Sequence, residues 1–527
     1  MKTLKKMTSS KLIILASMFL VLFDNVSFFR NVTGVYPVSI NNIAFLCSLA
    51  IVLAIVIILL FTLVSSKYTT KPILILILLI SSLTSYFMNS YNTVIDNSMI
   101  QNIVHTNIDE ALDLFNFKLI LYILFLGVLP SIFIYKVDIK YVSLKTEPIS
   151  KLKIVIISLL IIVSLIFIFS KFYTSFLREH KQLRYYTNPT FYVFSMGQYI
   201  NNIYKNGKII VKSVGTDAKI PSTDMDRELI ILVVGEAARA DRFSLNGYQR
   251  ETNPLLKKED IINFSNVHSC GTSTEISLPC MFSVFGKNKY SDKKGKSSEN
   301  LLDVLSHAGI NILWRDNNSS SKGVALRVPY EDYRNPKNNP ICDVECRDEG
   351  MLYGLQEYID RQKNGDILIV LHQMGNHGPA YYKRYPKSFE KFTPTCKTNE
   401  LNQCTKEEIG NAYDNAILYT DYFLSKVINL LKQNSNSFET AMLYFSDHGE
   451  SLGENEIYLH GLPYLIAPET QKHIPAIFWF GDSFKIDKNS LRNKISNEYS
   501  QDNLFHTVLG LMEVNTSVYD KNMDIIN

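Results

Sequence analysis

The stretch LIILVVGEAARADR, residues 229–242, decides the fold of the larger part of this chain. It begins with a continuous apolar run and passes directly into Glu236. Such a run is typical of a strand that is buried on both faces of a mainly parallel sheet. Runs of the same kind recur at residues 310–315, 366–372, 440–447 and 474–481. Because polar, helix-like stretches such as 406–434 separate them, we expect an α/β domain over residues 227–527.

Upstream of this domain the chain is dominated by apolar runs, although the average composition of 46% hydrophobic and 20% charged residues hides the change. A helix that crosses a membrane needs about 20 mostly apolar residues. Five candidates meet this requirement, at residues 12–29, 43–65, 72–88, 118–135 and 153–170. The sequence therefore predicts a five-helix membrane domain over residues 1–170.

The lysines predict how these spans are oriented. They gather in the N-terminal tail and in the second-to-third and fourth-to-fifth loops, whereas residues 89–117 contain four acids and no Lys or Arg. Positively charged loops stay in the cytoplasm, so residues after the fifth span are expected outside it. Residues 171–226, rich in Tyr, Lys and Asn, are expected to bridge the two domains, along the membrane interface or as an ordinary helical linker.

Six of the seven cysteines lie in the predicted α/β domain, in close pairs: Cys270 and Cys280, Cys342 and Cys346, Cys396 and Cys404. Closeness in sequence favours three local disulfides, which agrees with a compartment outside the cytoplasm. A zinc cluster is the alternative, but the spacings are not the short CxxC pairs of structural zinc sites.

Polar side chains follow the predicted strands at the point where each strand ends. They are Glu236, Asp447, His448, His372, His377 and, further along the chain, His460. Taken singly, each is equally explained as a helix cap or a packed histidine. Sites in such sheets form at the carboxyl ends of the strands, and a set of carboxylate oxygens and imidazole nitrogens suits Zn²⁺.

A hydroxyl-rich loop, SCGTSTEISLPC at residues 269–280, supplies a candidate nucleophile. Its hydroxyls are those of Thr272, Ser273, Thr274 and Ser277. A metal that binds an alcohol oxygen favours the alkoxide, and a disulfide across the loop would hold that oxygen in place. The string TEISLPCMFS favours a helix, whose first amides would stabilise an anionic oxygen. These arguments do not decide which hydroxyl reacts.

A second polar loop, WRDNNSSSKGV at residues 314–324, follows another predicted strand. It brings Asn318, Ser319 and Lys322 together. Amide, hydroxyl and ammonium groups at such a position suit a phosphate or a similar anion. A polar surface loop is the alternative.

Longer strings around these residues resemble the motifs of bacterial phosphoethanolamine transferases, which include lipid A-modifying enzymes and mobile colistin-resistance proteins. The strings are VVGEAARADRFSLNGYQRETNP, SCGTSTEISLPCMFS, WRDNNSSSKGV, HQMGNHGPAYYKRYP, FSDHGESLGE and LHGLPYLIAPETQ. The resemblance covers the whole chain. It implies five transmembrane helices followed by a periplasmic domain like that of sulfatases and alkaline phosphatases.

The resemblance also implies a role for each candidate residue. Thr274, the second threonine of CGTST, is expected to be the nucleophile, and with Glu236, Asp447 and His448 to bind zinc. Contacts to the phosphoethanolamine group are expected from Thr272, Asn318, Ser319, Lys322, His377 and His460. The two histidines of that set are candidates for acid–base catalysis or for a second zinc ion. Glu275 departs from the family pattern, which has a small or apolar residue there.

In the membrane half, Asn102, Thr106 and Glu110 match lipid-contact positions of the family. Their spacing places them on one face if residues 97–114 form a helix. An ordinary solvated helix face is the alternative.

The expected reaction moves phosphoethanolamine from phosphatidylethanolamine through a covalent Thr274 intermediate to a phosphate or sugar of lipid A or lipooligosaccharide. We expect a monomer in the inner membrane, with no nucleic-acid partner, that confers polymyxin resistance. The alternatives are a membrane-anchored phosphoglycerol transferase, a phosphatase or sulfatase-like hydrolase, and a non-enzymatic envelope protein. A sulfatase needs a C/S-x-P-x-R string, and none lies near Thr274.

Overall fold

The computed structural model describes residues 4–106, 108–140, 147–205 and 210–527. Over these ranges the chain divides into two compact units. The helical unit comprises Met1–Ile103 and Phe115–Ile203, and the sheet unit comprises Val104–Leu114 and Tyr204–Asn527. A short loop of the N-terminal half thus belongs to the same unit as the large C-terminal domain.

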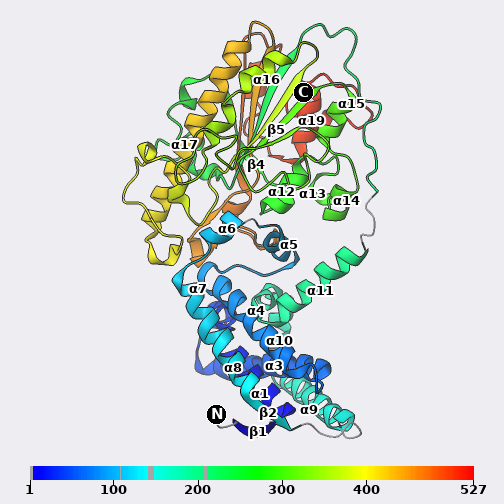
Figure 1. The fold of residues 1–527 in the computed structure, drawn as a ribbon, viewed down its shortest axis with the longest axis vertical. Coiled ribbons are helices and arrows are strands. Elements are labelled where there is room, and N and C mark those ends of the chain that lie inside the picture. Colours follow the sequence, from blue (N-terminus) through cyan, green and yellow to red (C-terminus); the bar gives the residue numbers. More distant parts are fainter. Residues whose placement is uncertain (1–3, 107, 141–146, 206–209) are drawn as a thin grey trace. The chain divides into compact units, whose positions relative to one another are not determined.

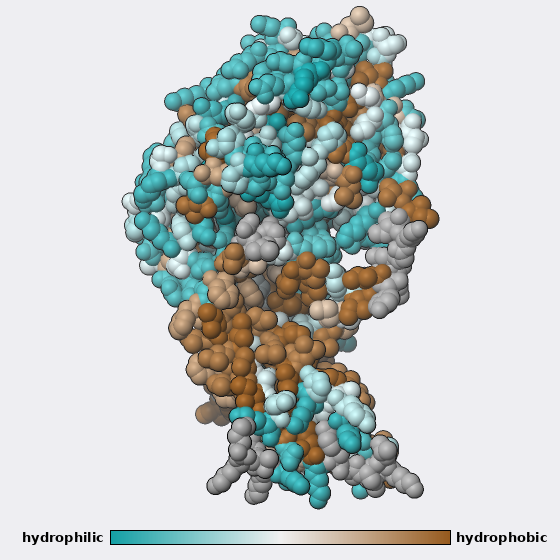
Figure 2. Space-filling model, in the orientation of Figure 1, coloured by the Kyte–Doolittle hydropathy of each residue, from teal (hydrophilic) through white to brown (hydrophobic). Residues whose placement is uncertain are grey.

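The helical unit is built from long apolar helices (Figure 1). Among the described residues, four helical spans are long and apolar enough to cross a membrane. A pair of helices joined at a bend makes a fifth if the pair counts as one span. They are α3 (Ile40–Val64), α4 (Thr70–Tyr91), Phe117–Lys136, α9 (Glu147–Ile168) and the pair α1 (Ser9–Phe23) with α2 (Val26–Val35). Figure 2 shows that hydrophobic side chains dominate the visible surface of this unit, as expected for contact with lipid.

The first predicted span, residues 12–29, is not one straight helix, because α1 and α2 meet at a bend of 56°. The bend falls at Asp24 and Asn25, and the Asn25 side chain competes with the backbone hydrogen bonds of a continuous helix. Asn25 Nδ2 donates to the Leu20 carbonyl at 2.9 Å and to that of Asn188 at 2.6 Å. The Asn188 amide in turn donates to Asn25 Oδ1 at 2.9 Å, so this reciprocal pair stabilises the bend.

The expected helix over residues 97–114 is divided in two. Helix α5 covers Asn97–His105 and α6 covers Ile108–Asp113, with Thr106 outside both. The prediction that Asn102, Thr106 and Glu110 share one helix face is therefore wrong. The remaining elements of the N-terminal half are β1 (Leu4–Thr8), α7 (Phe117–Tyr122), π-helix η1 (Ile123–Val128), α8 (Leu129–Lys136), β2 (Val137–Lys140), α10 (Ser170–Arg178), η2 (Lys181–Tyr186) and α11 (Thr190–Lys205).

The sheet unit contains an eight-stranded sheet in the described part of the chain. Its strand order is β12 (Tyr499–Ser500), β4 (Ile261–His268), β11 (His473–Phe480), β8 (Glu439–Ser446), β3 (Glu228–Gly235), β7 (Ile367–His372), β5 (Asn311–Asp316) and β6 (Tyr330–Asp332). All five predicted strands are present. Within the described sheet only β11 pairs antiparallel, with β4 and β8, so the prediction of a mainly parallel sheet is confirmed.

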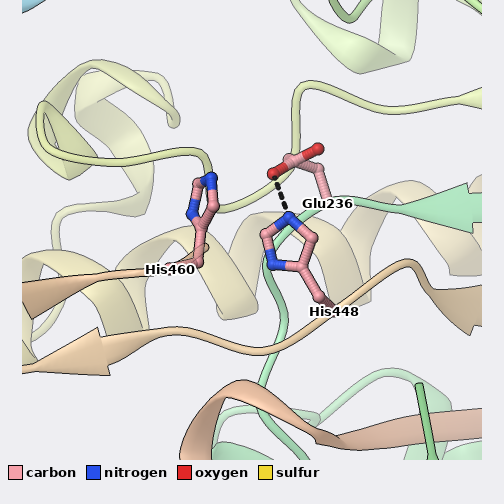
Figure 3. Close-up of side chains that lie close together, drawn as sticks. All are labelled: Glu236, His448 and His460. Carbon is pink, nitrogen blue, oxygen red and sulfur yellow. Dashed lines mark ion pairs between the residues drawn. The ribbon is translucent and has the colours of Figure 1, made fainter. Parts of the chain in front are cut away.

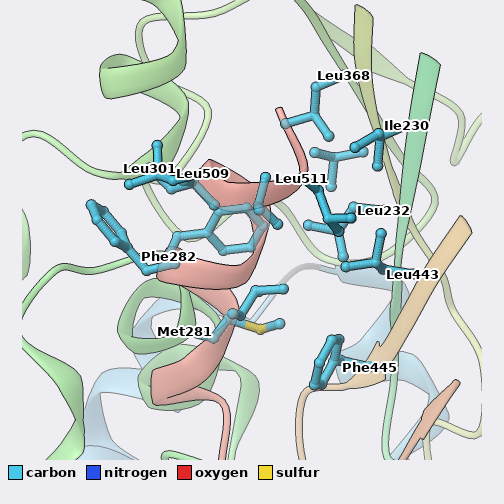
Figure 4. Packing of buried hydrophobic residues seen from close by; sticks show 14 of the residues in the cluster. Ile230, Leu232, Met281, Phe282, Leu301, Leu368, Leu443, Phe445, Leu509 and Leu511 are labelled. Carbon is cyan, nitrogen blue, oxygen red and sulfur yellow. The ribbon is translucent and has the colours of Figure 1, made fainter. Parts of the chain in front are cut away.

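Both faces of the sheet are covered, and alternate residues of β3 separate into two hydrophobic clusters. Ile230, Leu232 and Val234 pack with α12 (Thr274–Met281), α15 (Leu301–His307) and α19 (Asp502–Leu511) (Figure 4). Leu229, Ile231 and Val233 pack with α16 (Leu355–Arg361) and α17 (Lys406–Asn434). With both faces buried, the polar groups of the central strands can gather only where these strands end.

Smaller elements complete the sheet unit: α13 (Gly286–Lys289), α14 (Asp292–Lys296), α18 (Lys488–Arg492), β9 (Ser451–Leu452) and β10 (Tyr458–Leu459). The predicted disulfides are confirmed, because the described cysteines pair as Cys270–Cys280, Cys342–Cys346 and Cys396–Cys404.

Candidate active site

The ends of two adjacent parallel strands bring the predicted carboxylates together. Glu236 follows β3, and Asp447 and His448 follow β8. Gly235 and Ser446 are paired in register, so Glu236 and Asp447 leave the sheet side by side. All three side chains are fully buried.

Of the hydroxyls in the cross-linked loop, that of Thr274 lies at this carboxylate pair. Thr274 is the first residue of α12, and its Oγ1 lies 3.0 Å from Glu236 Oε2 and 3.3 Å from His448 Nε2. Two of the other hydroxyls have different partners: Thr272 Oγ1 donates to the Leu462 carbonyl at 2.6 Å, and Ser277 Oγ lies against Gln501 Oε1, at 2.7 Å, and the Asp447 carbonyl. The geometry therefore favours Thr274 as the reactive alcohol.

The buried groups around Thr274 fit a divalent cation. Glu236 Oε1 and Asp447 Oδ2 have no hydrogen-bond partner among the described residues. His448 Nδ1 lies 2.8 Å from the Gly449 carbonyl, which can only accept, so Nδ1 carries the proton and Nε2 presents a lone pair. That lone pair lies 3.4 Å from Glu236 Oε1 and 3.4 Å from Asp447 Oδ2. Two carboxylate oxygens and an imidazole lone pair this close are a typical zinc donor set.

Ligand atoms of Glu236, His448 and His460 also lie within 4.8 Å of one another (Figure 3). Burial, and after it the neighbouring Asp447 carboxylate, raise the pKa of Glu236 well above its usual range. A bound cation would reverse this effect by favouring the ionised carboxylate.

Glu450 is a functional candidate that the sequence reasoning missed. It is fully buried, and both of its carboxylate oxygens lie 3.4 Å from His460 Nδ1. The ring of His460 is centred 4.2 Å from that of His448 and 5.9 Å from that of His377. Glu450 therefore orients His460 toward the site. Its place two residues after His448, in FSDHGES, was the available signal.

Replacing Glu450 with glutamine is expected to lower kcat/KM by about 10- to 100-fold, the usual effect of removing a carboxylate that orients an active-site histidine. The measurement is steady-state kinetics on the detergent-solubilised full chain, with protein-bound metal determined in parallel. Glu456→Gln is the matched control, since Glu456 is an exposed glutamate six residues further along the chain, beyond β9. Equal kinetics for the two variants would remove Glu450 from the site.

His377 is held as a neutral imidazole. Burial, followed by the nearby Arg384, lowers its pKa well below the usual value, so the ring can accept a proton at neutral pH. Arg384 Nε donates to the His377 carbonyl at 2.6 Å. The Arg384 guanidinium also pairs with Glu345, a residue of the Cys342–Cys346 loop. This disulfide loop thus supports the position of His377.

Three of the residues expected to contact the phosphoethanolamine group lie in the loop after β5, but Asn318 already has partners. Its Nδ2 donates to Glu236 Oε2 at 2.8 Å and to the Gln373 carbonyl at 2.8 Å. Asn318 therefore positions Glu236 in this structure. Ser319 is buried beside it, and Lys322, at a φ of +47°, places its Nζ 4.0 Å from Glu275 Oε2.

Two connections that hold the site were not predictable from local motifs. Gln501 Nε2 donates to the Asp447 carbonyl at 2.8 Å, and Gln501 Oε1 accepts from the Cys270 amide at 2.7 Å. It thereby ties the cross-linked loop to the end of β8. Gly375, with a φ of +49°, passes so close to Glu236 that an added Cβ would lie 2.9 Å from the Glu236 carbonyl oxygen.

Two residues of the segment Val104–Leu114 contact other segments of the sheet unit. His105 Nδ1 lies 2.8 Å from Glu275 Oε1, next to the nucleophile candidate. Asp113 pairs with Lys383 and, at 2.8 Å, with Arg384. The loop is therefore attached at both ends to segments that carry Thr274 and His377.

His372 has partners other than the groups around Thr274. His372 is the last residue of β7, and its Nδ1 lies 3.1 Å from Asp316 Oδ2, beside the Trp314 ring. Asn102 belongs to the helical unit, and the Glu110 side chain lies outside the described part of the chain.

The fold and the site together define a membrane-anchored member of the sulfatase-like class. The sulfatase family model matches residues 228–514, and the model of phosphoethanolamine transferase EptA/EptB matches residues 53–204. Phosphatidylethanolamine transferase Mcr-1 of Escherichia coli is 45% identical over 476 residues, which are 88% of this chain and 88% of that protein. Phosphoethanolamine transferase EptA of Escherichia coli K12 is 40% identical over 526 residues, covering 98% and 96%.

Among solved structures, the integral membrane protein lipooligosaccharide phosphoethanolamine transferase A of Neisseria meningitidis matches with a TM-score of 0.95. It is 37% identical and covers 99% of both chains. This chain therefore belongs to the phosphoethanolamine transferase family.

Proposed function

We propose that this protein transfers phosphoethanolamine from phosphatidylethanolamine to a phosphate or sugar of lipid A or lipooligosaccharide. The observation that carries the proposal is the position of Thr274 Oγ1, 3.0 Å from Glu236 Oε2 and 3.3 Å from the His448 Nε2 lone pair. A buried alcohol between a carboxylate and an imidazole is a nucleophile arrangement.

In the first step Thr274 Oγ attacks the phosphorus of phosphatidylethanolamine and passes its proton to Glu236 Oε2, 3.0 Å away, while the bond from phosphorus to the diacylglycerol oxygen breaks. The departing diacylglycerol oxygen takes a proton, for which His460, oriented by Glu450, is the donor candidate. Phosphoethanolamine remains esterified to Thr274. Lys322 and Ser319 are the candidates for binding its phosphoryl oxygens, while Asn318 keeps Glu236 in place and the Thr272 hydroxyl stays on the Leu462 carbonyl.

In the second step an acceptor oxygen attacks the same phosphorus, the bond from phosphorus to Thr274 Oγ breaks, and that oxygen takes its proton back from Glu236 Oε2. His377 is the candidate base for a sugar hydroxyl, because burial keeps its ring unprotonated at neutral pH, while the lowered pKa also makes it a weak base. A phosphate acceptor is already ionised and needs no such base.

Glu236, Asp447, His448 and Thr274 would hold a zinc ion, with His460 and His377 as candidates for a second one. Bound there, the ion would lower the pKa of the Thr274 hydroxyl and stabilise negative charge as it develops.

We further propose an inner-membrane location with the sheet unit in the periplasm. The apolar helices and the disulfides support it, since disulfides persist in that oxidising compartment. Adding an ammonium group to lipid A would offset phosphate charge and weaken the binding of cationic peptides such as polymyxin.

Removing the metal is expected to abolish transfer, and adding Zn²⁺ back is expected to restore it. The measurement follows labelled phosphatidylethanolamine and purified lipid A in detergent with the full chain, before and after chelation. Mg²⁺ is the matched control, because it prefers an all-oxygen octahedral site. Full activity after chelation would contradict the zinc assignment. Release of free phosphoethanolamine without a modified acceptor would identify a hydrolase instead.

A further inference from the structure

Glu275 is a buried acidic residue beside the nucleophile candidate, and the reaction outlined above does not use it. It is the second residue of α12, directly after Thr274, and its side chain is 4% exposed. Its Oε1 lies 2.8 Å from His105 Nδ1, and its Oε2 lies 4.0 Å from Lys322 Nζ. Burying a carboxylate is costly, so this position calls for partners of opposite charge.

Lys322 and Glu275 carry opposite charges and lie close together, but their side chains are too far apart for a hydrogen bond between them. The side chain of Lys322 is 8% exposed, so both charges lie in a poorly solvated region where they act strongly. Their separation of 4.0 Å exceeds the hydrogen-bond range of about 2.7–3.2 Å. The pair therefore presents a positive and a negative group 4.0 Å apart, and the negative group belongs to the residue that directly follows Thr274.

The group that the proposed reaction places on Thr274 is also a pair of opposite charges. Phosphoethanolamine carries a negative phosphoryl group and a positive ammonium, separated by one ethylene linker. Lys322 is the candidate for the phosphoryl oxygens. With the phosphoryl group on Lys322, the linker is long enough to bring the ammonium to the neighbouring carboxylate.

We propose that Glu275 is the subsite for the ammonium of the transferred group, and that the Lys322–Glu275 pair selects a zwitterionic headgroup. The inference rests on the proposed transferase function and deepens it. An ammonium on a buried carboxylate makes a charge-assisted hydrogen bond, which is about twice as strong as a neutral one.

The low exposure of Glu275 does not put it out of reach. Thr274, which the substrate has to meet, is itself only 8% exposed. One partner of Glu275, His105, is 41% exposed. His105 thus holds the carboxylate before the substrate binds, and the ammonium replaces or joins that contact.

Two soluble phosphodiesters test this proposal: p-nitrophenyl phosphoethanolamine and p-nitrophenyl ethyl phosphate, which lacks the amine. With each, Thr274 attacks phosphorus and nitrophenolate leaves, so its release reports the first step. The zinc-loaded full chain in detergent is expected to favour the ethanolamine ester by about 10- to 100-fold in kcat/KM. In Glu275→Gln this preference is expected to fall to within about threefold of unity, mainly through KM of the ethanolamine ester. Because the ratio is measured within one protein, differences in folded fraction cancel.

His105→Ala is the companion variant, because it removes the other contact of Glu275 and leaves the carboxylate. It is expected to keep the preference for the ethanolamine ester. If the ratio of kcat/KM for the two esters is unchanged in Glu275→Gln, the ammonium subsite is refuted. This holds even if kcat/KM falls equally for both esters, in which case Glu275 only supports Lys322. If His105→Ala loses the preference for the ethanolamine ester as completely as Glu275→Gln does, the ammonium subsite is also refuted. Glu275 would then serve to hold the segment Val104–Leu114 in place.

The wild-type protein separates this inference from the function on which it rests. Cleavage of both esters with equal kcat/KM would refute the ammonium subsite alone. Cleavage of neither ester would refute the transferase proposal.

Discussion

Replacing Thr274 with valine is expected to lower the transfer rate by about 10⁴-fold or more, on the scale seen when an enzyme loses its nucleophile. Valine keeps the shape of threonine but removes the only Thr274 atom that lies within hydrogen-bond distance of Glu236 and His448. Intact-mass measurement after incubation with phosphatidylethanolamine, without acceptor, is expected to find no adduct on the variant. The wild-type chain is expected to gain one phosphoethanolamine.

Thr274→Ser is the matched control, because serine retains the hydroxyl at the start of α12. It is expected to form the adduct, with a lower rate. An adduct of normal amount on the valine variant would assign the chemistry to another hydroxyl of the loop.

Replacing Glu236 with glutamine is expected to have opposite effects on the metal-free and the zinc-loaded protein. Without metal, the variant is expected to unfold at a higher temperature than the wild type, because burial and Asp447 disfavour the ionised Glu236 carboxylate. Zinc is expected to raise the Tm of the wild type, because a ligand that binds the folded state stabilises it. The variant lacks one zinc ligand, so most of this rise is expected to be lost. Thermal unfolding of the full chain, with and without Zn²⁺, measures both effects.

The pH dependence of the metal-free protein follows from the same pKa. Folding raises the pKa of this carboxyl group above its unfolded-state value of about 4.5. Below that pH the group is protonated in both states and does not destabilise the fold. As pH rises above it, ionisation favours the unfolded state, so the folded state becomes less stable. The stability of the metal-free wild type is therefore expected to fall on going from pH 4.5 to neutral pH. The Glu236→Gln variant is expected to show a smaller fall.

Glu228→Gln is the matched control, because Glu228 begins the same strand that Glu236 follows. Burial, and after it Asp366, raise the pKa of Glu228 to about 9. This control is expected to stabilise the metal-free protein as well, but to keep the full zinc-dependent increase in Tm. The same loss of zinc response in both variants would contradict a metal site at Glu236.

Much of the sheet and the site could be predicted because the decisive residues are adjacent in sequence. Strands β3 and β8 are buried on both faces, so they read as continuous apolar runs, and Glu236 and Asp447 follow them directly. Strand β4 was missed because its buried and partly exposed residues alternate, which leaves no such run. The choice of Thr274 among four hydroxyls needed the family resemblance, since all four lie within six residues, 272–277.

The features that could not be predicted depend on contacts between distant parts of the chain. Gln501 reaches the Cys270 amide across 231 residues, and no local pattern marks a glutamine for that role. The bend at Asp24 and Asn25 likewise depends on Asn188, which lies 163 residues further on. Local periodicity predicts which face of an element is buried, but it carries no information on such partners.

The assignment of Val104–Leu114 to the sheet unit has a consequence for inhibitor discovery. A water-soluble fragment that begins near residue 204 would lack His105 and Asp113, the partners of Glu275, Lys383 and Arg384. In such a fragment, Glu275 and the pair Lys383 and Arg384 would be exposed to compounds. In the full chain, His105 and Asp113 contact these residues. Screening campaigns against this protein should therefore use the detergent-solubilised full chain, or graft the eleven-residue loop onto the fragment.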